Sequence, residues 1–205
     1  MGEGQEGNRA YFGIGECHFA VELRAARVPQ PTTDAVLRMT PQWPDAEKEL
    51  APHQAHLAVS ASVDHGDAVN LACEFTRLLA ALASVSASIG VCWLNGPVLC
   101  SAEEFVGIAA EMLGLGTPPL MLWIAAHWKP EGQLIHTKGV PQFATAELFV
   151  AQQRERSVEM VEYLFDLAHY VLTSGKELIA GETIDGPRGV FRIESLSGSD
   201  SRKRE

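Results

Sequence analysis

The sequence predicts an α+β fold: a single domain with one mixed β-sheet and helices packed mainly on one face of that sheet. Three observations predict it. Strand-period and helix-period segments alternate through the first half of the chain, and a β-hairpin follows in the second half. No segment of roughly 20–50 residues repeats, as a solenoid or propeller would require. The length of 205 residues, with 46% hydrophobic and 20% charged residues, suits one globular domain.

Both ends of the chain are expected to be flexible. Residues 1–15 contain five glycines and few side chains that could pack. Gly2–Gly7 matches the letters of the G-x-G-x-x-G nucleotide motif, but no strand precedes it and no helix follows, so we expect no nucleotide site there. Residues 197–205 form a charged tail. Residues 16–196 then make up the single α+β domain.

The first half of the domain shows two strands and two helices. Residues 17–23 alternate between apolar and polar side chains and predict a strand, and residues 31–39 suit a short helix. Residues 57–63 alternate again and predict the second strand. Asp67 stands at the N-cap of an amphipathic helix, whose apolar side chains recur at helical spacing as far as Leu82.

A buried strand and a capped helix come next. Residues 89–94, "IGVCWL", are apolar enough for a strand buried on both faces. Ser101 and Glu104 have the spacing of a capping box, which places a helix start at residue 101.

The last third contains a hairpin, a helix and a strand. Residues 118–128 and 133–138 flank the four-residue loop "KPEG" and predict the hairpin. Ser157 and Gly175 are residue types that begin and end a helix, and the segment between them has helical periodicity. Strands are expected over residues 146–152 and 189–196.

Three histidines and two aspartates crowd the strand at residues 57–63: His53, His56, Asp64, His65 and Asp67. A strand of this length spans roughly 20 Å, so histidines before it and after it lie at opposite ends and cannot share one ion. The aspartates have a sufficient role as negative charges at a helix N-terminus. We therefore expect no metal and no cofactor here.

The predicted hairpin sorts its side chains into two faces. If Trp128 pairs with Gln133, the even-numbered residues Leu122–Trp128 face the core, and Trp123, His127 and His136 share the opposite face. Either these side chains are covered by a helix or simply packed, or the face is a contact patch anchored by Trp123.

The second alternative makes Trp123, His127 and His136 partner-binding residues. Tyr163 and Tyr170, on the polar side of the last helix, are the next candidates.

The composition of the chain restricts where the protein can be located and which classes of partner it can bind. A net charge of −10 and a pI near 5.2 argue against a nucleic-acid surface. The N-terminus lacks the apolar segment of a signal peptide, and no apolar run reaches the ~20 residues of a membrane span.

The four cysteines form no C-x-x-C pair and lie among apolar residues. They are expected to be reduced, unpaired thiols in a cytoplasmic protein.

Several segments, taken together, resemble the bacterial domain-of-unknown-function family 4261. They are "WPDAEKELAPHQAHLAVS", "IGVCWLNGPVLCSAEEF", "PLMLWIAAHW", "HTKGVPQF" and "VEYLFDLAHYVLTSGKELIAGETI". The resemblance runs from about Phe19 to Ile184 and lies in the series of segments rather than in a single motif. It implies a bacterial, soluble α+β domain. It implies no reaction and no catalytic residue, since the family is uncharacterised.

These observations favour a non-enzymatic, cytoplasmic protein-binding domain. The function we expect is that of an immunity protein that neutralises a bacterial toxin or effector, and a basic partner would suit the acidic charge. The alternative is an enzyme or small-ligand-binding protein whose site assembles only in three dimensions, from His127, His136, Asp166 or His169. Those side chains would then converge in one pocket.

Overall fold

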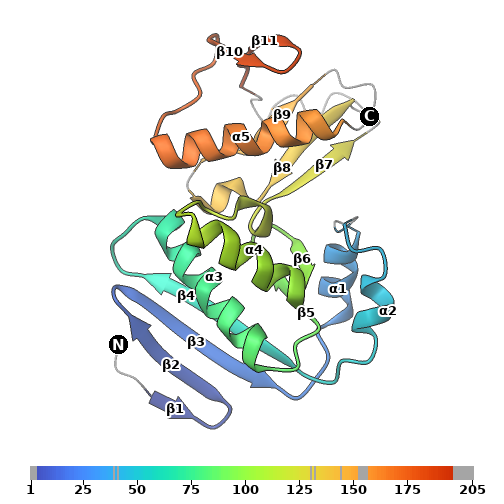
Figure 1. Cartoon of the computed structure of the whole chain (residues 1–205), viewed down its shortest axis with the longest axis vertical. Helices are drawn as coiled ribbons and strands as arrows, with labels where there is room; N and C mark the ends of the chain where they lie inside the picture. The colour runs from blue at the N-terminus through green and yellow to red at the C-terminus, as the bar shows by residue number, and fades with distance from the viewer. Residues whose placement is uncertain are drawn as a thin grey trace.

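A computed structural model describes residues 4–38, 40, 42–129, 131, 133–143, 145–151 and 157–195. The predicted α+β class is confirmed, but the single mixed sheet is wrong. The described strands form four separate sheets, and every strand pair in them is antiparallel. Figure 1 shows the two larger sheets at opposite ends of the molecule.

The N-terminal sheet has four strands in sequence order: β1 (Gly4–Glu6), β2 (Arg9–Ile14), β3 (Cys17–Arg24) and β4 (His56–Val63). Its side chains alternate between two faces. Phe19 is buried on one face and stacks against Phe75 of helix α3 (Ala68–Val85), with 6.5 Å between the ring centres. The opposite face carries the ion-paired side chains of Arg9 and Glu22.

Residues 1–15 were expected to be flexible, and the described part of that segment forms strands β1 and β2, of which β2 pairs along its whole length with β3. The glycines that suggested flexibility serve the turns instead. Gly7 (φ +60°) and Gly15 (φ +59°) adopt the left-handed backbone conformation at the two hairpin turns. The tail at residues 197–205 lies outside the described residues.

Helix α3 lies between the N-terminal sheet and a short hairpin, which explains why no mixed sheet forms. A helix that joins two strands often makes them parallel neighbours. Here β5 (Gly90–Trp93) pairs with β6 (Val98–Ser101) and not with β4. Phe75 of α3 contacts Trp93 of β5, with 5.2 Å between ring centres, so the hairpin packs on the helix rather than extending the sheet.

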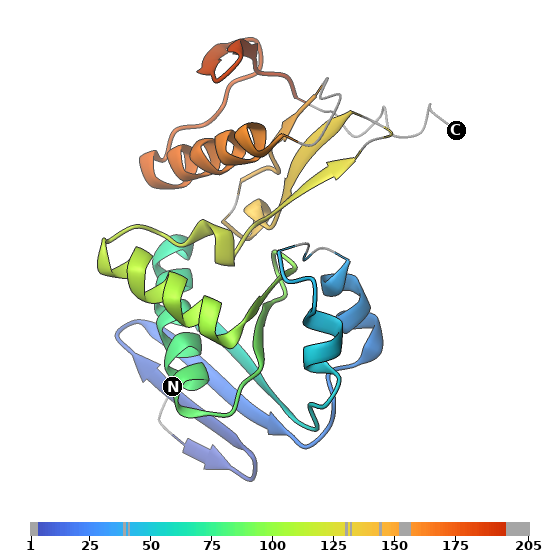
Figure 2. The ribbon, with the colours of Figure 1, turned by 45° about the vertical axis from the view of Figure 1, so that its right-hand side comes forward.

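Three further helices cover this part of the chain. Helix α4 (Ala102–Gly114) packs on α3, and α1 (Gln30–Leu37) and α2 (Ala46–Leu50) lie beside the β5–β6 hairpin (Figures 1 and 2). A small second core joins these two helices to the hairpin. Its buried members are Val36, Trp43, Ala46 and Leu99.

The C-terminal part contains a three-stranded sheet, β7 (Ala125–Lys129), β8 (Leu134–Lys138) and β9 (Phe149–Val150), with helix α5 (Val158–Ser174) across one face. The 3-10 helices η1 (Leu120–Leu122) and η3 (Val140–Phe143) lie at its base. A final hairpin, β10 (Thr183–Gly186) with β11 (Gly189–Arg192), follows α5.

The predicted helix ends are confirmed. The Asp67 carboxylate accepts a hydrogen bond from the Val69 N–H, the Ser101 hydroxyl from Glu104 N–H, and the Ser157 hydroxyl from Met160 N–H. Gly175 ends α5 with φ +65°.

The register of the β7–β8 hairpin differs from the expected one by two residues. Trp128 pairs with Ile135, not Gln133, and His127 pairs with His136. A shift of two residues leaves every side chain on its predicted face, because side-chain direction has a period of two. His127 and His136 therefore share a face as expected.

Trp123 does not lie on that face. Residues 120–122 form η1 rather than a strand, and the Trp123 side chain is completely buried. Its Nε1–H donates to the Thr76 hydroxyl (2.8 Å), which itself donates to the Ala72 carbonyl. Its ring stacks on Trp93 and packs at a tilt against Phe143, with centre-to-centre distances of 5.9 and 5.5 Å. The expectation of an exposed contact residue at position 123 is thus corrected.

The backbone around Trp123 is packed as closely as its ring. The Gln142 amide donates to the carbonyls of Trp123 (3.0 Å) and Gly139 (2.6 Å) and accepts from Trp93 Nε1–H (2.8 Å). A Cβ added to Gly96 would lie 1.7 Å from the Trp123 carbonyl oxygen. Only glycine fits at position 96.

We predict that Trp123→Ala lowers the free energy of unfolding by about 3–5 kcal/mol, since it opens a cavity and leaves Thr76 without its indole donor. Met121→Ala, in the same segment but with a half-exposed side chain, is the control and should cost about 0.5 kcal/mol. Urea unfolding followed by tryptophan fluorescence measures both. Equal effects of the two substitutions would contradict the assigned role of Trp123.

Glycine substitutions give a second prediction about the fold. Gly96→Ala should destabilise the protein by at least about 1–3 kcal/mol, because the backbone at Trp123 must move. Gly107→Ala, on an open stretch of α4 with no atom within 4 Å, should be neutral or should stabilise by up to about 1 kcal/mol. Thermal unfolding by circular dichroism compares them, and a stable Gly96→Ala protein would refute the close approach.

Candidate functional site

The five residues expected to bind a partner do not form one surface. Trp123 belongs to the core. Tyr163 is half-buried, donates its hydroxyl to the Asp185 carbonyl (3.1 Å) and stacks on Phe191. It therefore holds the β10–β11 hairpin against α5. Tyr170 is 40% exposed on α5, and the Lys176 ammonium lies 5.7 Å from its ring centre.

His127 and His136 lie side by side on the face of the β7–β8–β9 sheet that α5 does not cover. Their ring centres are 5.6 Å apart, and His136 Nδ1 lies 3.2 Å from the His127 carbonyl oxygen. The alternate residue Ile135 points the other way, into the core that α5 shares. Burial and the nearby Lys129 and Lys138 lower the pKa of His136, and the hydrogen bond to the His127 carbonyl opposes that effect.

The alternative catalytic set does not converge. Asp166 is exposed on α5, whose buried side chains Leu164 and Ala168 face the sheet. The helix and the sheet therefore separate Asp166 from His127 and His136. His169 has no hydrogen bond from its imidazole among those observed between the described residues.

The histidines around β4 are tied to the backbone at separate places. His53 accepts a hydrogen bond from Val28 N–H (3.0 Å), and its other ring nitrogen lies 2.6 Å from the Leu50 carbonyl. His56 Nδ1 lies 2.7 Å from the Ala26 carbonyl, whereas His65 is exposed at the far end of β4. Within the described residues, no three histidine, cysteine or acidic side chains lie close enough together to hold one metal ion.

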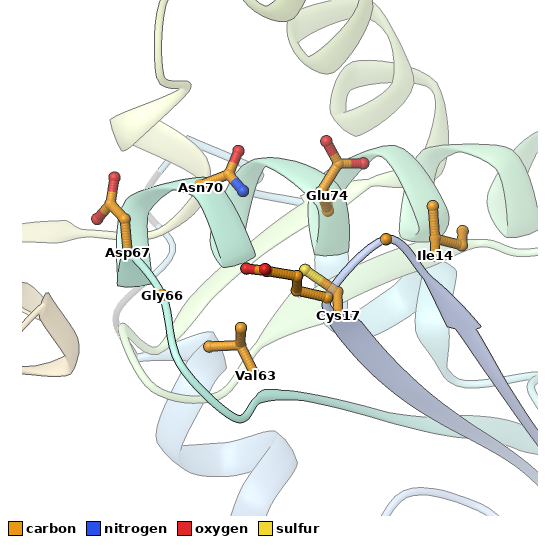
Figure 3. A pocket seen from close by; sticks show the side chains of 9 residues that line it. Ile14, Cys17, Val63, Gly66, Asp67, Asn70 and Glu74 are labelled. Carbon is orange, nitrogen blue, oxygen red and sulfur yellow. The ribbon is translucent and has the colours of Figure 1, made fainter. Parts of the chain in front are cut away.

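A hollow of about 260 Å³ lies at the N-terminus of α3 (Figure 3). Asp67, Asn70 and Glu74 line it from α3, one helical turn apart, because positions separated by three and four residues share a helix face. Glu16, in the turn between β2 and β3, and Cys17, the first residue of β3, line it from the other side. We call this feature the acidic hollow.

Charge in the acidic hollow is mostly negative. Three carboxylates surround it, those of Glu16, Asp67 and Glu74. Asp67 also caps α3, and Glu74 is paired with Arg77 (2.6 Å), so part of the charge is compensated. The remaining carboxylate oxygens are acceptors for a cationic group that enters from solvent.

Cys17 lies at the floor of the acidic hollow but is not activated there. Its side chain is 3% exposed. Burial, and then the negative charges of Glu74 and Glu16, raise the pKa of its thiol. A thiol becomes nucleophilic only as the thiolate, so this surrounding opposes its use as a nucleophile.

A second, shallow depression of about 400 Å³ lies on the outer face of the N-terminal sheet. It is lined by Arg9, Tyr11, Glu22 and Arg24, together with Ala20 of β3 and Ala58, Val59 and Ser60 of β4. Glu22 accepts from both Arg9 (2.7 Å) and Arg24 (3.2 Å). These arginines hold the pKa of Glu22 below its usual value, so the three side chains satisfy one another.

The comparisons with known proteins concern the last third of the chain. Residues 136–198 match the model of a protein family described as Domain of unknown function (DUF4261). The resemblance seen in the sequence is thus confirmed for this segment. The match covers 63 residues, from β8 to just beyond β11, whereas the resemblance was expected to begin near Phe19. No curated protein and no solved structure matches the chain.

The DUF4261 segment contains His136, Tyr163 and Tyr170 but none of the residues of the acidic hollow. The acidic hollow was missed in the sequence because its carboxylates come from residues 16 and 67–74. The only local signal is the spacing of Asp67, Asn70 and Glu74 on one helix face.

Helix α3 was not recognised from the sequence as a possible membrane segment. It is the one helix of the described residues that is long and apolar enough to cross a bilayer, with a mean hydropathy of 1.4 over 18 residues. One such helix is weak evidence, because a core helix passes the same test. Here α3 packs against the N-terminal sheet on one side and α4 on another.

All four cysteines are free thiols in the structure, and burial raises the pKa of Cys92 to about 11 and of Cys100 to about 12. We predict that the native protein at pH 8 reacts slowly with Ellman's reagent. The protein unfolded without reductant should release four equivalents. Two equivalents would reveal a disulfide, and rapid reaction of the native protein would contradict the burial.

Proposed function

We propose that this protein is a non-enzymatic, cytoplasmic binding domain that neutralises a basic protein partner, as an immunity protein does for an antibacterial toxin. The observation that supports the proposal most directly is the acidic hollow. A concave surface with carboxylates on both sides suits a lysine or arginine side chain of a partner, since charge-assisted hydrogen bonds are the strong ones.

The size of the acidic hollow favours a side chain over a free small molecule. Its volume of about 260 Å³ falls below the ~300–1,000 Å³ of typical small-molecule sites. A protruding side chain of a protein fills such a volume while the rest of the contact extends over the surrounding surface.

The charge of the whole chain supports the same choice of partner. At −10, the protein attracts a basic protein from a distance and raises the rate of encounter. Because salt screens such attraction, association with the partner should slow as ionic strength rises.

The test uses the purified protein as bait in a lysate of its source organism, with mass spectrometry of what is captured. We expect one basic protein to bind the wild type and to be lost at high salt. The double variant Glu16→Gln, Glu74→Gln should weaken its binding at least about tenfold, equivalent to about 1.4 kcal/mol.

The control is Glu111→Gln, Glu162→Gln, which removes the same charge from exposed positions on α4 and α5. It should bind as the wild type does. Equal losses in both variants would show that only net charge matters. Capture of an acidic protein, or of none, would refute the proposed function.

A further inference from the structure

The outer face of the β7–β8–β9 sheet is a local concentration of basic groups on an acidic protein. Alternate residues of β7 and β8 share this face, and four of them are basic: His127, Lys129, His136 and Lys138. The chain has five lysines in all, so two of the five lie here. Phe149 of β9 stands beside His136 on the same face.

Within the described part of the chain, the two lysines on this face are not neutralised by ion pairs. Neither Lys129 nor Lys138 takes part in a salt bridge between described residues. Among the described residues, Glu147 supplies the carboxylate that acts electrostatically on His136. It is already engaged, since it accepts hydrogen bonds from the Thr137 hydroxyl (2.7 Å) and Gly139 N–H (2.8 Å).

We propose that this face binds an acidic segment of a protein, with Lys129 and Lys138 contacting carboxylates on either side of His136. The inference rests on the proposed function in one respect: the segment belongs to the protein partner. It adds a second contact, with chemistry opposite to that of the acidic hollow.

The spacing of the lysines selects an extended segment over a single small anion. Lys138 pairs with Ala125, and Lys129 lies four residues further along β7. At ~3.3 Å per residue, the two lysine backbones are separated by roughly 13 Å along the strand direction. One phosphate engages two such lysines only if both side chains bend inward, whereas two carboxylates of an extended peptide meet them directly.

His136 makes the binding sensitive to pH. In the neutral ring, Nδ1–H donates to the His127 carbonyl, which leaves Nε2 to accept the second proton. Burial, Lys129 and Lys138 oppose that proton and lower the pKa, while the His127 carbonyl and Glu147 favour it. A bound carboxylate adds a negative charge, raises the pKa and so causes proton uptake. Affinity therefore increases as pH falls through the range just below the ordinary histidine pKa of ~6.5.

The test uses NMR of the full chain with ¹³C-labelled histidine, and an acetylated hexaglutamate peptide as the probe. We expect the peptide to shift the His136 ring signal, to raise its pKa and to bind more tightly at pH 6 than at pH 7.5. The double variant Lys129→Gln, Lys138→Gln should weaken binding of the peptide at least about tenfold. The control, Lys48→Gln with Lys176→Gln, removes equal charge elsewhere and should leave binding unchanged.

Three results would overturn the inference. In the first, the peptide does not shift the ring signal of His136. In the second, the control variant loses as much affinity for the peptide as the test variant does. In the third, inorganic phosphate binds as tightly as the peptide, which would make the face a site for small oxyanions. Because the probe is a defined peptide, these results do not depend on the partner of the acidic hollow. That partner is tested by the glutamate variants.

Discussion

The fold depends on the burial of one indole ring, that of Trp123. A row of aromatic contacts runs from Phe19 in the N-terminal sheet through Phe75 of α3 and Trp93 of β5 to Trp123, and continues to Phe143 at the base of the C-terminal sheet. Each buried aromatic side chain removes a large apolar area from water. The polar atoms of the two tryptophans would be costly if left unpaired, and Thr76 and Gln142 satisfy them. The N-terminal and C-terminal sheets are thereby connected by one row of aromatic contacts.

Local chemistry was predictable from the sequence, and strand pairing was predictable only at the β7–β8 hairpin. Asp67, Ser101 and Ser157 were assigned as helix caps because a cap depends on a few neighbouring residues. The partner of β5 depends on where Phe75 and Trp93 meet, and periodicity carries no information about that contact. The N-terminal strand β2 was missed for a related reason: its glycines resemble those of a flexible segment until β3 is placed beside it.

The predicted partner-binding residues divide in the same way, into those that a local pattern placed correctly and those that it did not. His127 and His136 were placed on one face correctly, because even a register error of two residues preserves the face. Trp123 was placed wrongly because residues 120–122 form a 3-10 helix, where the period of two does not apply. The acidic hollow brings together a turn near residue 16 and a helix face near residue 70. Its assembly follows from the pairing of β3 with β4, which no local pattern encodes.

The boundaries of the DUF4261 match do not coincide with a part of the chain that could be inherited or expressed as an independent unit. The matched segment begins inside β8, after Ile135 and without β7, the strand that pairs with β8. Of the eighteen described residues that are buried in the main core cluster, only six lie inside it. A gene fragment cut at residue 136 would therefore encode an interrupted sheet with most of its packing partners missing. The segment shared with the family is therefore recognisable as sequence but is not a complete packing unit. A unit that recombination could move intact extends back at least to α3, because α3 supplies Thr76, the hydrogen-bond partner of Trp123.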